Sequence, residues 1–225
     1  MAGFGTVTAS TAQERIAETT TNVSYPTATI AAGDLLILLG SVYAPSGAPV
    51  TNPAGWTADV NATRLTSTTP PGIYAGHKYA AGGESGTLAV THQNNVSLWV
   101  MLHVPGVDPT TALDVSPFIL TDNGSSQNHT DVSLTTVTAG CLLIYAAALN
   151  ATTATSTPPT VPGTFTEVAD LSTGTRSAEF AYLKWSGVGA TGTVANLWSS
   201  SARSMGALLA FRPARAKSNF MMFGQ

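Results

Sequence analysis

Two stretches of the chain repeat one pattern: Thr27-Ala-Thr-Ile-Ala-Ala-Gly-Asp-Leu-Leu-Ile37 and Leu134-Thr-Thr-Val-Thr-Ala-Gly-Cys-Leu-Leu-Ile144. In each stretch, small and β-branched residues lead to a glycine, and a short apolar run follows. Gly33 therefore matches Gly140, which lies 107 residues later. An apolar run that begins at a glycine turn signal is typical of a buried strand. The pattern indicates an internal duplication of a β-strand unit.

Three further blocks occur in the same order in both halves. Asn52–Thr57 matches Val161–Thr166 at an offset of 109, Ile73–Lys78 matches Glu179–Lys184 at 106, and Ser97–Val104 matches Ser204–Phe211 at 107. Loop-sized insertions explain the small drift in offset. Four ordered blocks predict two copies of one unit, at about residues 25–118 and 131–214.

Each copy is predicted to hold about six strands. In the first copy they cover residues 25–30, 35–43, 56–65, 73–80, 87–92 and 96–104, and clusters of Gly, Pro, Asn and Ser separate them, including a turn at 93–95. In the second copy, strands are expected to start near residues 132, 141, 165, 178, 193 and 205. The runs 35–39 and 98–104 are almost wholly apolar, as in central strands that are covered on both faces or buried in a sandwich core. The predicted fold class is all-β, an antiparallel β-sandwich of jelly-roll or concanavalin-like type built from two duplicated halves.

Two domain arrangements fit this pattern. The halves could form two separate sandwiches, or one sandwich whose sheets each take strands from both halves. The polar join at residues 121–130 lacks the length and the repetition of a linker, which favours a single domain over residues 25–214. Residues 1–24 and 215–225 then lie outside the repeat as an N-terminal arm and a C-terminal arm.

The composition excludes several classes of function. Only 9% of the residues are charged, against about 25% in typical domains. The net charge of −3 is spread along the chain, so binding of nucleic acid through its phosphates is not expected. The start of the chain has neither the basic nor the apolar region of a signal peptide. The best apolar stretch, residues 141–149, is far shorter than the roughly 20 residues that span a bilayer, so no membrane partner is expected.

Candidate catalytic and metal-binding residues are few. Asp108 and Asp114 flank one loop and could form the carboxylate pair of a glycan hydrolase, but capping of turns is the favoured interpretation. The one oxygen-rich cluster contains Asp122, Asn123, Ser125, His129 and Asp131, and it has too few acids for a calcium loop. The single cysteine, Cys141, starts an apolar run and is interpreted as a core residue. The sequence therefore predicts no catalytic residue, no metal and no cofactor.

The large aromatic residues divide into two groups. Trp56 and Phe165 follow matching Pro/Gly turns, and Trp99 lies in an apolar run, so all three are predicted to anchor the core. Trp185 and Trp198 border polar loops. A tryptophan beside a polar loop can stack on a sugar ring, so these two residues are the candidate glycan contacts.

Several phrases of the sequence are similar to those of a known class of proteins. They are Gly33-Asp34-Leu35-Leu36-Ile37, Pro53-Ala54-Gly55-Trp56-Thr57, Tyr74 with Lys78, and Pro105-Gly106-Val107-Asp108-Pro109 followed by Leu113-Asp114. In these phrases the chain resembles small virion proteins of tailed bacteriophages, which are lectin-like or jelly-roll-like β-sandwiches of the minor tail or capsid-surface (decoration) type. The resemblance covers about residues 25–214. The second half departs from it, since Phe165 replaces the tryptophan and Cys141 the aspartate.

The resemblance implies a structural protein of the virion, made in the host cytoplasm and acting by assembly without enzymatic activity. Its expected partners are other capsid or tail subunits, further copies of the chain and a host surface glycan. The basic and apolar C-terminal arm is the expected assembly segment, with Arg215, Lys217, Phe220, Met221, Met222 and Phe223. A carbohydrate-binding module for host attachment is the alternative, and a glycan hydrolase is the third hypothesis.

Overall fold

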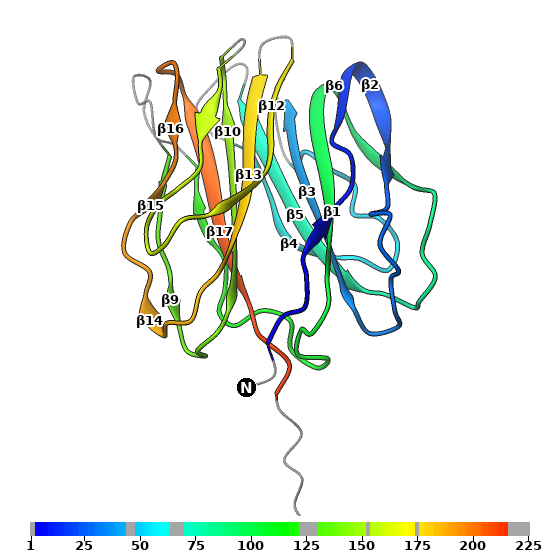
Figure 1. Cartoon of the computed structure of the whole chain (residues 1–225). Coiled ribbons are helices and arrows are strands. Elements are labelled where there is room, and N and C mark those ends of the chain that lie inside the picture. The colour runs from blue at the N-terminus through cyan, green and yellow to red at the C-terminus, as the bar shows by residue number, and fades with distance from the viewer. Residues whose placement is uncertain are drawn as a thin grey trace, which may run out of the picture.

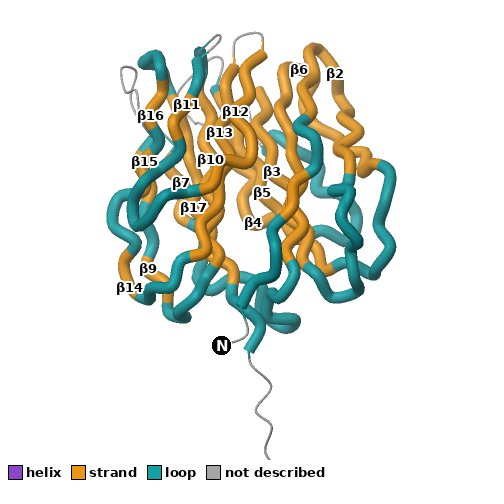
Figure 2. The backbone as a smooth tube through the Cα atoms, in the orientation of Figure 1, coloured by secondary structure: helices purple, strands orange, loops and turns teal. Residues whose placement is uncertain are grey.

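A computed structural model of the chain describes residues 3–43, 48–63, 70–121, 130–151, 154–173 and 176–215. Within these ranges the protein is all-β, contains no helix, and pairs its strands antiparallel. No helix in the described part is therefore long and apolar enough to cross a membrane. Figures 1 and 2 show two curled sheets side by side, with loop segments outside them.

The first sheet has the strand order β1-β6-β3-β5-β4, and β2 pairs with β6 off this path. Its strands are β1 (Thr8–Ala9), β2 (Gln13–Ser24), β3 (Leu35–Tyr43), β4 (Thr57–Thr63), β5 (Pro71–Tyr79) and β6 (Thr87–Val104). The second sheet has the order β12-β13-β10-β17-β7. Its strands are β7 (Phe118–Leu120), β10 (Leu142–Leu149), β12 (Thr166–Thr173), β13 (Arg176–Lys184) and β17 (Ser204–Phe211).

Short strands cover the outer face of the second sheet. They are β8 (Asp131–Val132), β9 (Thr135–Thr136), β11 (Ser156–Thr157), β14 (Gly189–Ala190), β15 (Val194–Ala195) and β16 (Leu197–Trp198). They pair as β8 with β15, β9 with β14 and β11 with β16. We call these strands and the loops between them the covering layer. Figure 1 shows it outside β10 and β17.

Three buried apolar clusters explain the long apolar runs in the sequence. The inner cluster joins both sheets and includes Leu35 and Ile37 of β3 with Leu142 and Ile144 of β10. The side chains between them point outward, because successive residues of a strand face opposite sides. Leu36 and Leu38 lie in an outer cluster of the first sheet, and Leu143 and Tyr145 lie in another beneath the covering layer. The prediction that residues 35–39 form a strand covered on both faces is confirmed.

The first sheet takes all its strands from the part of the chain before the join, and the second takes its strands from the part after it, except for β7 (Phe118–Leu120), which pairs with β17. The expectation that each sheet would mix strands from both halves therefore holds only for this one short strand of the second sheet. Sequential strands pair with each other within each half, as neighbours along a chain usually do. The order β6-β3-β5-β4 in the first sheet has the same form as β17-β10-β13-β12 in the second. Register shifts occur at Ala58/Val60 in β4 and at Glu167/Ala169 in β12, which are corresponding places.

The strand registers correct one of the sequence matches. Ala75 lies opposite Leu39 and Val60, and Phe180 lies opposite Ala146 and Ala169. Ala75 therefore corresponds to Phe180, an offset of 105 rather than 106. A slip of one residue exchanges the two faces of a strand. The residue that corresponds to Glu179 is thus Tyr74 and not Ile73.

The N-terminal region also differs from the expectation. Residues 13–24 were expected in an arm, but they form β2, which pairs with β6 from Gln13 opposite Trp99 to Ser24 opposite Thr87. The expected strand at 25–30 is a loop. The predicted turn at 93–95 lies inside β6, where the register with β2 jumps from Glu18–Asn95 to Thr20–Thr91. A bulge can accommodate turn-favouring residues without ending the strand.

Candidate functional site

The described chain begins and ends at the same end of the molecule, which we call the base (Figure 1). Gly106 links the two termini there. Its amide carbonyl accepts a hydrogen bond from Ala214 N at 2.7 Å, and a Cβ at Gly106 would lie 2.8 Å from the carbonyl oxygen of Gly3. Gly106 has a φ of +83°, which glycine adopts at little cost. Gly106 therefore holds the two ends of the described chain close together at the base.

The larger groove of the base has a volume of about 440 Å³. It is lined by Asp108, Pro109, Thr110, Thr111, Arg212, Ala214 and Arg215. Arg215 is the most accessible cation of this groove, since 85% of its side chain is exposed and its Nε lies 4.0 Å from Asp108 Oδ2. Arg215 is the only member of the expected assembly arm within the described residues. Lys217, Phe220, Met221, Met222 and Phe223 lie outside them.

Asp108 and Asp114 at this end of the molecule are engaged in local hydrogen bonds. Asp108 Oδ1 accepts from Thr110 N, Thr110 Oγ1 and Thr111 N at 2.7–3.2 Å. These bonds lower the pKa of Asp108. Asp114 Oδ2 accepts from Val137 N at 2.7 Å, and its Oδ1 accepts from Arg212 Nε at 2.9 Å. Asp108 therefore caps its own turn, as predicted, whereas Asp114 joins its loop to residues that are distant in the sequence.

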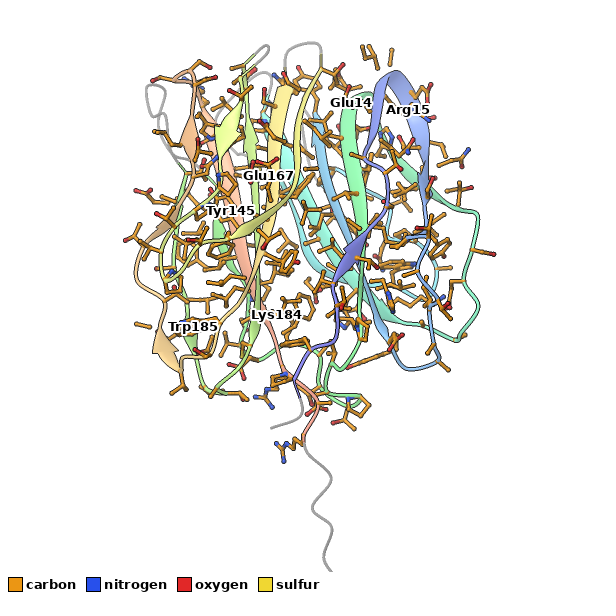
Figure 3. All side chains as sticks on the ribbon, in the orientation of Figure 1. Glu14, Arg15, Tyr145, Glu167, Lys184 and Trp185 are labelled. Atoms are coloured by element: carbon orange, nitrogen blue, oxygen red, sulfur yellow. The ribbon has the colours of Figure 1, made fainter. Side chains whose placement is uncertain are left out.

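The smaller groove has a volume of about 220 Å³ and contains the half-buried Trp185. It is lined by Gly3, Phe4, Gly140, Lys184, Trp185 and Ser186. A Cβ at Gly187 would lie 2.6 Å from the indole, so this glycine allows the backbone to lie directly against the ring. Lys184 Nζ donates to the carbonyl oxygen of Gly5 at 2.6 Å and fixes the N-terminal segment. Lys184 and Trp185 are labelled in Figure 3, toward the base.

The other predicted aromatic residues are buried. Trp99 is fully buried, and Trp56 and Phe165 are 6% and 3% exposed. Trp198, the second candidate glycan contact, is only 2% exposed, and its Nε1 donates to Thr130 Oγ1 at 3.2 Å. Because this indole points from the covering layer into the outer cluster of the second sheet, it cannot stack on a sugar. The prediction for Trp198 as a surface contact is wrong.

The structure forms polar clusters that the sequence motifs did not reveal. His103 Nε2 lies 2.7 Å from Asp34 Oδ2, and His103 Nδ1 lies 3.4 Å from Thr8 Oγ1. Because a carboxylate accepts, His103 Nε2 carries a proton in this contact, and Nδ1 hydrogen-bonds to the Thr8 hydroxyl. This arrangement could polarise a hydroxyl, but His103 is 3% exposed and none of the three residues lines either groove. The contacts fasten β1 to β6 and β3. Only the strand register, which sets Leu36 opposite His103, could have predicted them.

A second cluster was also missed. Glu179 of β13 is fully buried, and neither of its carboxyl oxygens has a hydrogen-bond partner in the described part of the chain. Asp170 faces it across the β12–β13 ladder. Burial raises the pKa of Glu179 to about 9, the neighbouring charges of Glu167 and Asp170 add to the shift, and the nearby Ser156 hydroxyl opposes it. The wrong sequence register concealed this group, because it matched Glu179 with the inward-facing Ile73.

The residues considered for metal binding are placed only in part. Of the cluster at the join, residues 122–129 lie outside the described ranges, while Asp131 lies in β8. Among the described residues, no group of three or more His, Cys, Asp and Glu side chains is placed to hold a metal ion. Cys141 is fully buried, and its Sγ donates to the carbonyl oxygen of Thr138 at 3.0 Å.

Comparison of the chain with protein-family models, with curated proteins and with solved structures gives no match.

Proposed function

We propose that the chain is a structural virion protein of a tailed bacteriophage, at the capsid surface or the tail tip, which acts by assembly through its base. We further propose that its body is a β-sandwich of two duplicated halves. The equal strand order of the two sheets and the corresponding bulges in β4 and β12 support the duplication. Two unrelated segments are not expected to share a strand order and the position of an irregularity.

The observation that carries the assembly proposal is the architecture of the base. Both ends of the described chain meet there, beside a groove of about 440 Å³ that carries the exposed Arg215. Segments that leave a compact body at one point can tie neighbouring subunits together without unfolding the body. Arg215 lies 4.0 Å from Asp108 Oδ2, but 85% of its side chain is exposed. In this proposal the exposed part of its guanidinium also contacts a partner.

Low surface charge also supports assembly. With charged residues at 9% of the chain, little electrostatic repulsion opposes dense packing of copies. In this proposal the arm with Arg215, Lys217, Phe220, Met221, Met222 and Phe223 docks on another virion subunit or a second copy. The chain acts in this way without catalysis, because Asp108 and Asp114 are hydrogen-bonded into loops and Glu179 lies beneath the covering layer.

Truncation tests the role of the arm. We expect a chain that ends at residue 215 to remain folded by circular dichroism and to self-associate less in sedimentation velocity than the full chain. Arg215→Ala should weaken association in the same direction. Arg15→Ala is the matched control, because Arg15 is a partly exposed cation at the opposite end of the molecule (Figure 3). Equal association of the truncated and full-length chains would contradict assembly through the arm.

A separate measurement tests the virion location. Phage particles produced from the genome that encodes this chain should contain it in stoichiometric amounts by quantitative mass spectrometry. Antibodies against the chain should label either the capsid or the tail tip in electron micrographs. Particles that lack the chain after extensive purification would overturn the virion proposal, whatever the truncated protein does.

The groove at Trp185 favours a second candidate function, binding of a host surface glycan. A partly exposed indole beside a hydroxyl and an ammonium group can stack on a sugar ring and bond to its hydroxyls. Saturation-transfer NMR with glucose, galactose, rhamnose and N-acetylglucosamine tests this candidate. Trp185→Ala should abolish the transfer, whereas Phe118→Ala, which removes a different exposed aromatic side chain, should not. No transfer to any of the four sugars would remove the candidate.

A further inference from the structure

Three carboxylate oxygens without a hydrogen-bond donor lie together on strands β12 and β13. They are both oxygens of Glu179 and Oδ1 of Asp170, in the described part of the chain. The other oxygen of Asp170 accepts from the backbone N of Ser156, in β11 of the covering layer, at 2.9 Å. Figure 3 labels Glu167 on β12 and Tyr145 on β10, and both interact electrostatically with Glu179. The cluster therefore lies between the second sheet and the covering layer.

The matching positions of the first sheet are neutral and satisfied. Tyr74 corresponds to Glu179, and its hydroxyl donates to Asn52 Oδ1 at 2.6 Å. Asn61 corresponds to Asp170, and its amide accepts from Val50 N and donates to Val50 O, at 3.3 and 2.8 Å. An amide can both accept and donate, whereas an ionised carboxylate can only accept. The second sheet needs one additional proton to complete the same kind of network.

Among the described residues, the charged groups that act on Glu179 are acids. Glu167 and Asp170 on β12 are acids, and the nearby phenol of Tyr145 on β10 is itself next to Asp131 of β8. Arg176 lies on the same strand, but its guanidinium is over the ring of Tyr43 of the first sheet, 4.4 Å from the ring centre. A buried charge without a partner is strongly unfavourable, so such a group gives up its charge. Either a proton or a bound cation must neutralise this cluster.

The geometry favours the proton. A calcium ion takes 6–8 oxygen ligands, and the described residues gather no three acidic, His or Cys side chains for a metal. A single proton on Glu179 removes the charge and supplies the missing donor. We propose that Glu179 is a neutral carboxylic acid in the folded protein, donating to Asp170 Oδ1, and that its ionisation releases the covering layer at β11.

Ser156 connects the acidic cluster to the rest of the covering layer. The Ser156 hydroxyl accepts a hydrogen bond from Asn196 Nδ2 at 2.6 Å. Ser156 also pairs with Trp198 in the β11–β16 ladder. Ionised Glu179 beside ionised Asp170 would repel the carboxylate that holds Ser156 N. The buried Trp198 is therefore a reporter of the release, and Trp99 in the outer cluster of the first sheet is an internal control.

The pH dependence has a defined sign. The unfolded chain loses the Glu179 proton near the ordinary pKa of glutamate, whereas burial keeps it on the folded protein up to about pH 9. Between these values the unfolded state binds fewer protons, so stability falls as the pH rises. Glu179→Gln is neutral at this position at all pH values. The equilibrium constant for unfolding of the natural chain, divided by that of Glu179→Gln, should rise by up to about tenfold per pH unit in this window and then level off.

Fluorine NMR of the full chain labelled with 5-fluorotryptophan, combined with urea titrations from pH 5 to 10, tests the proposal. We expect the Trp198 resonance to shift or broaden above pH 9 while the Trp99 resonance stays unchanged, and Glu179→Gln to abolish the change. Infrared spectra at pH 7 should contain the carbonyl stretch of a protonated carboxylic acid, lost in Glu179→Gln. Tyr74→Phe, the change at the matching position, should lower stability equally at all these pH values.

Two results would overturn the proposal. One is a pH dependence of unfolding that is the same in Glu179→Gln as in the natural chain, together with no carboxylic-acid band at pH 7. The other is stabilisation of the natural chain, but not of Glu179→Gln, by calcium chloride at pH 7, because a cation would then neutralise the cluster. Neither result depends on whether the protein assembles into virions.

Discussion

Trp99 fills the outer core of the first sheet, whereas Gly206 stands at the matching position of the second sheet. Trp99 lies opposite Gly40, and a Cβ at Gly40 would approach the indole to 2.3 Å. Gly206 lies opposite Ala147, and a Cβ on Gly206 would meet Thr130 Cγ2 at 2.5 Å. In each sheet a side chain fills the space over the glycine of a central strand, but the side chain is Trp99 of β6 in the first sheet and Thr130 in the second. Equal strand order therefore does not require equal side chains, provided that the total volume is kept.

The polar groups differ between the sheets in the same manner. Asp34 and His103 form a hydrogen bond in the first sheet, while Cys141 and Ala210 occupy the matching positions in the second. Tyr74 and Asn61 correspond to Glu179 and Asp170. Each exchange replaces a satisfied polar pair by an apolar pair, or a neutral pair by an acidic one. Substitutions at matching positions can therefore distinguish contacts that both halves need for stability from contacts that occur in one half only.

The largest effect is expected from the two aromatic residues that precede β4 and β12. Trp56→Ala and Phe165→Ala should each lower the free energy of unfolding by about 3–5 kcal/mol, since both side chains are buried and both leave a cavity. Urea denaturation followed by circular dichroism measures the loss. Similar losses support equivalent anchoring in the two halves. A loss below about 1 kcal/mol for either variant would show that the anchoring is confined to one half.

A smaller effect is expected from exchanging Gly40 for alanine. The added methyl group collides with Trp99, which is fully buried and cannot move away, so Gly40→Ala should cost about 1–3 kcal/mol. Ala147→Gly is the matched change in the second sheet, and it should cost no more than about 1 kcal/mol. The same urea titrations measure both. A larger loss of unfolding free energy for Ala147→Gly than for Gly40→Ala would contradict the idea that different side chains fill the same space in the two sheets.

The sequence predicted the central strands well because their apolar runs depend on burial alone. β3, β10 and β17 lie where the glycine signals and apolar runs indicated. β2 was missed because Gln13–Ser24 is polar and mostly exposed. Its strand conformation follows from pairing with β6, which no local pattern of residues encodes. Ala17 even adopts a φ of +57°, within the irregular part of that ladder.

The Asp34–His103 pair should contribute less than the core aromatic residues. Asp34→Ala removes the partner of the buried His103 and of Ala31 N, so we expect a loss of about 1–3 kcal/mol. Cys141→Ala, the matched change, removes only a weak bond from sulfur to the Thr138 carbonyl and should cost roughly 1 kcal/mol or less. Thermal unfolding of both variants at pH 7 provides the comparison. Equal losses would indicate that the Asp34–His103 hydrogen bond adds nothing to the stability of the first half.

The polar sites could be predicted only in part. Asp108 was identified as a turn cap because its sequence neighbour Thr110 supplies the bonds. The donors to Asp114 are Val137 and Arg212, which are far away in the sequence, and no local pattern predicted them. The Thr8, Asp34 and His103 cluster joins three strands, so its members are far apart in the sequence. Glu179 was hidden by a shift of one residue in the match between β5 and β13. Alternation of inner and outer faces would have corrected that shift, since Ala75 and Phe180 both belong to the inner cluster.

The smallest expected effect on stability concerns the single thiol, whose reactivity compares the matching positions 34 and 141 directly. Burial raises the pKa of Cys141 to about 12, and the nearby Asp114 adds to the shift. At pH 8 the folded protein should therefore react with a disulfide reagent about a thousand times more slowly than an unfolded thiol, whose pKa is near 8.5. A cysteine introduced by Asp34→Cys in a Cys141→Ala background should react faster than Cys141, because the Asp34 side chain is 17% exposed and lies beside His103. Circular dichroism checks that both proteins are folded, and 6 M urea should equalise their rates. Faster reaction of Cys141 in the folded state would show that position 141 is open to solvent and that the two halves do not bury this position as described.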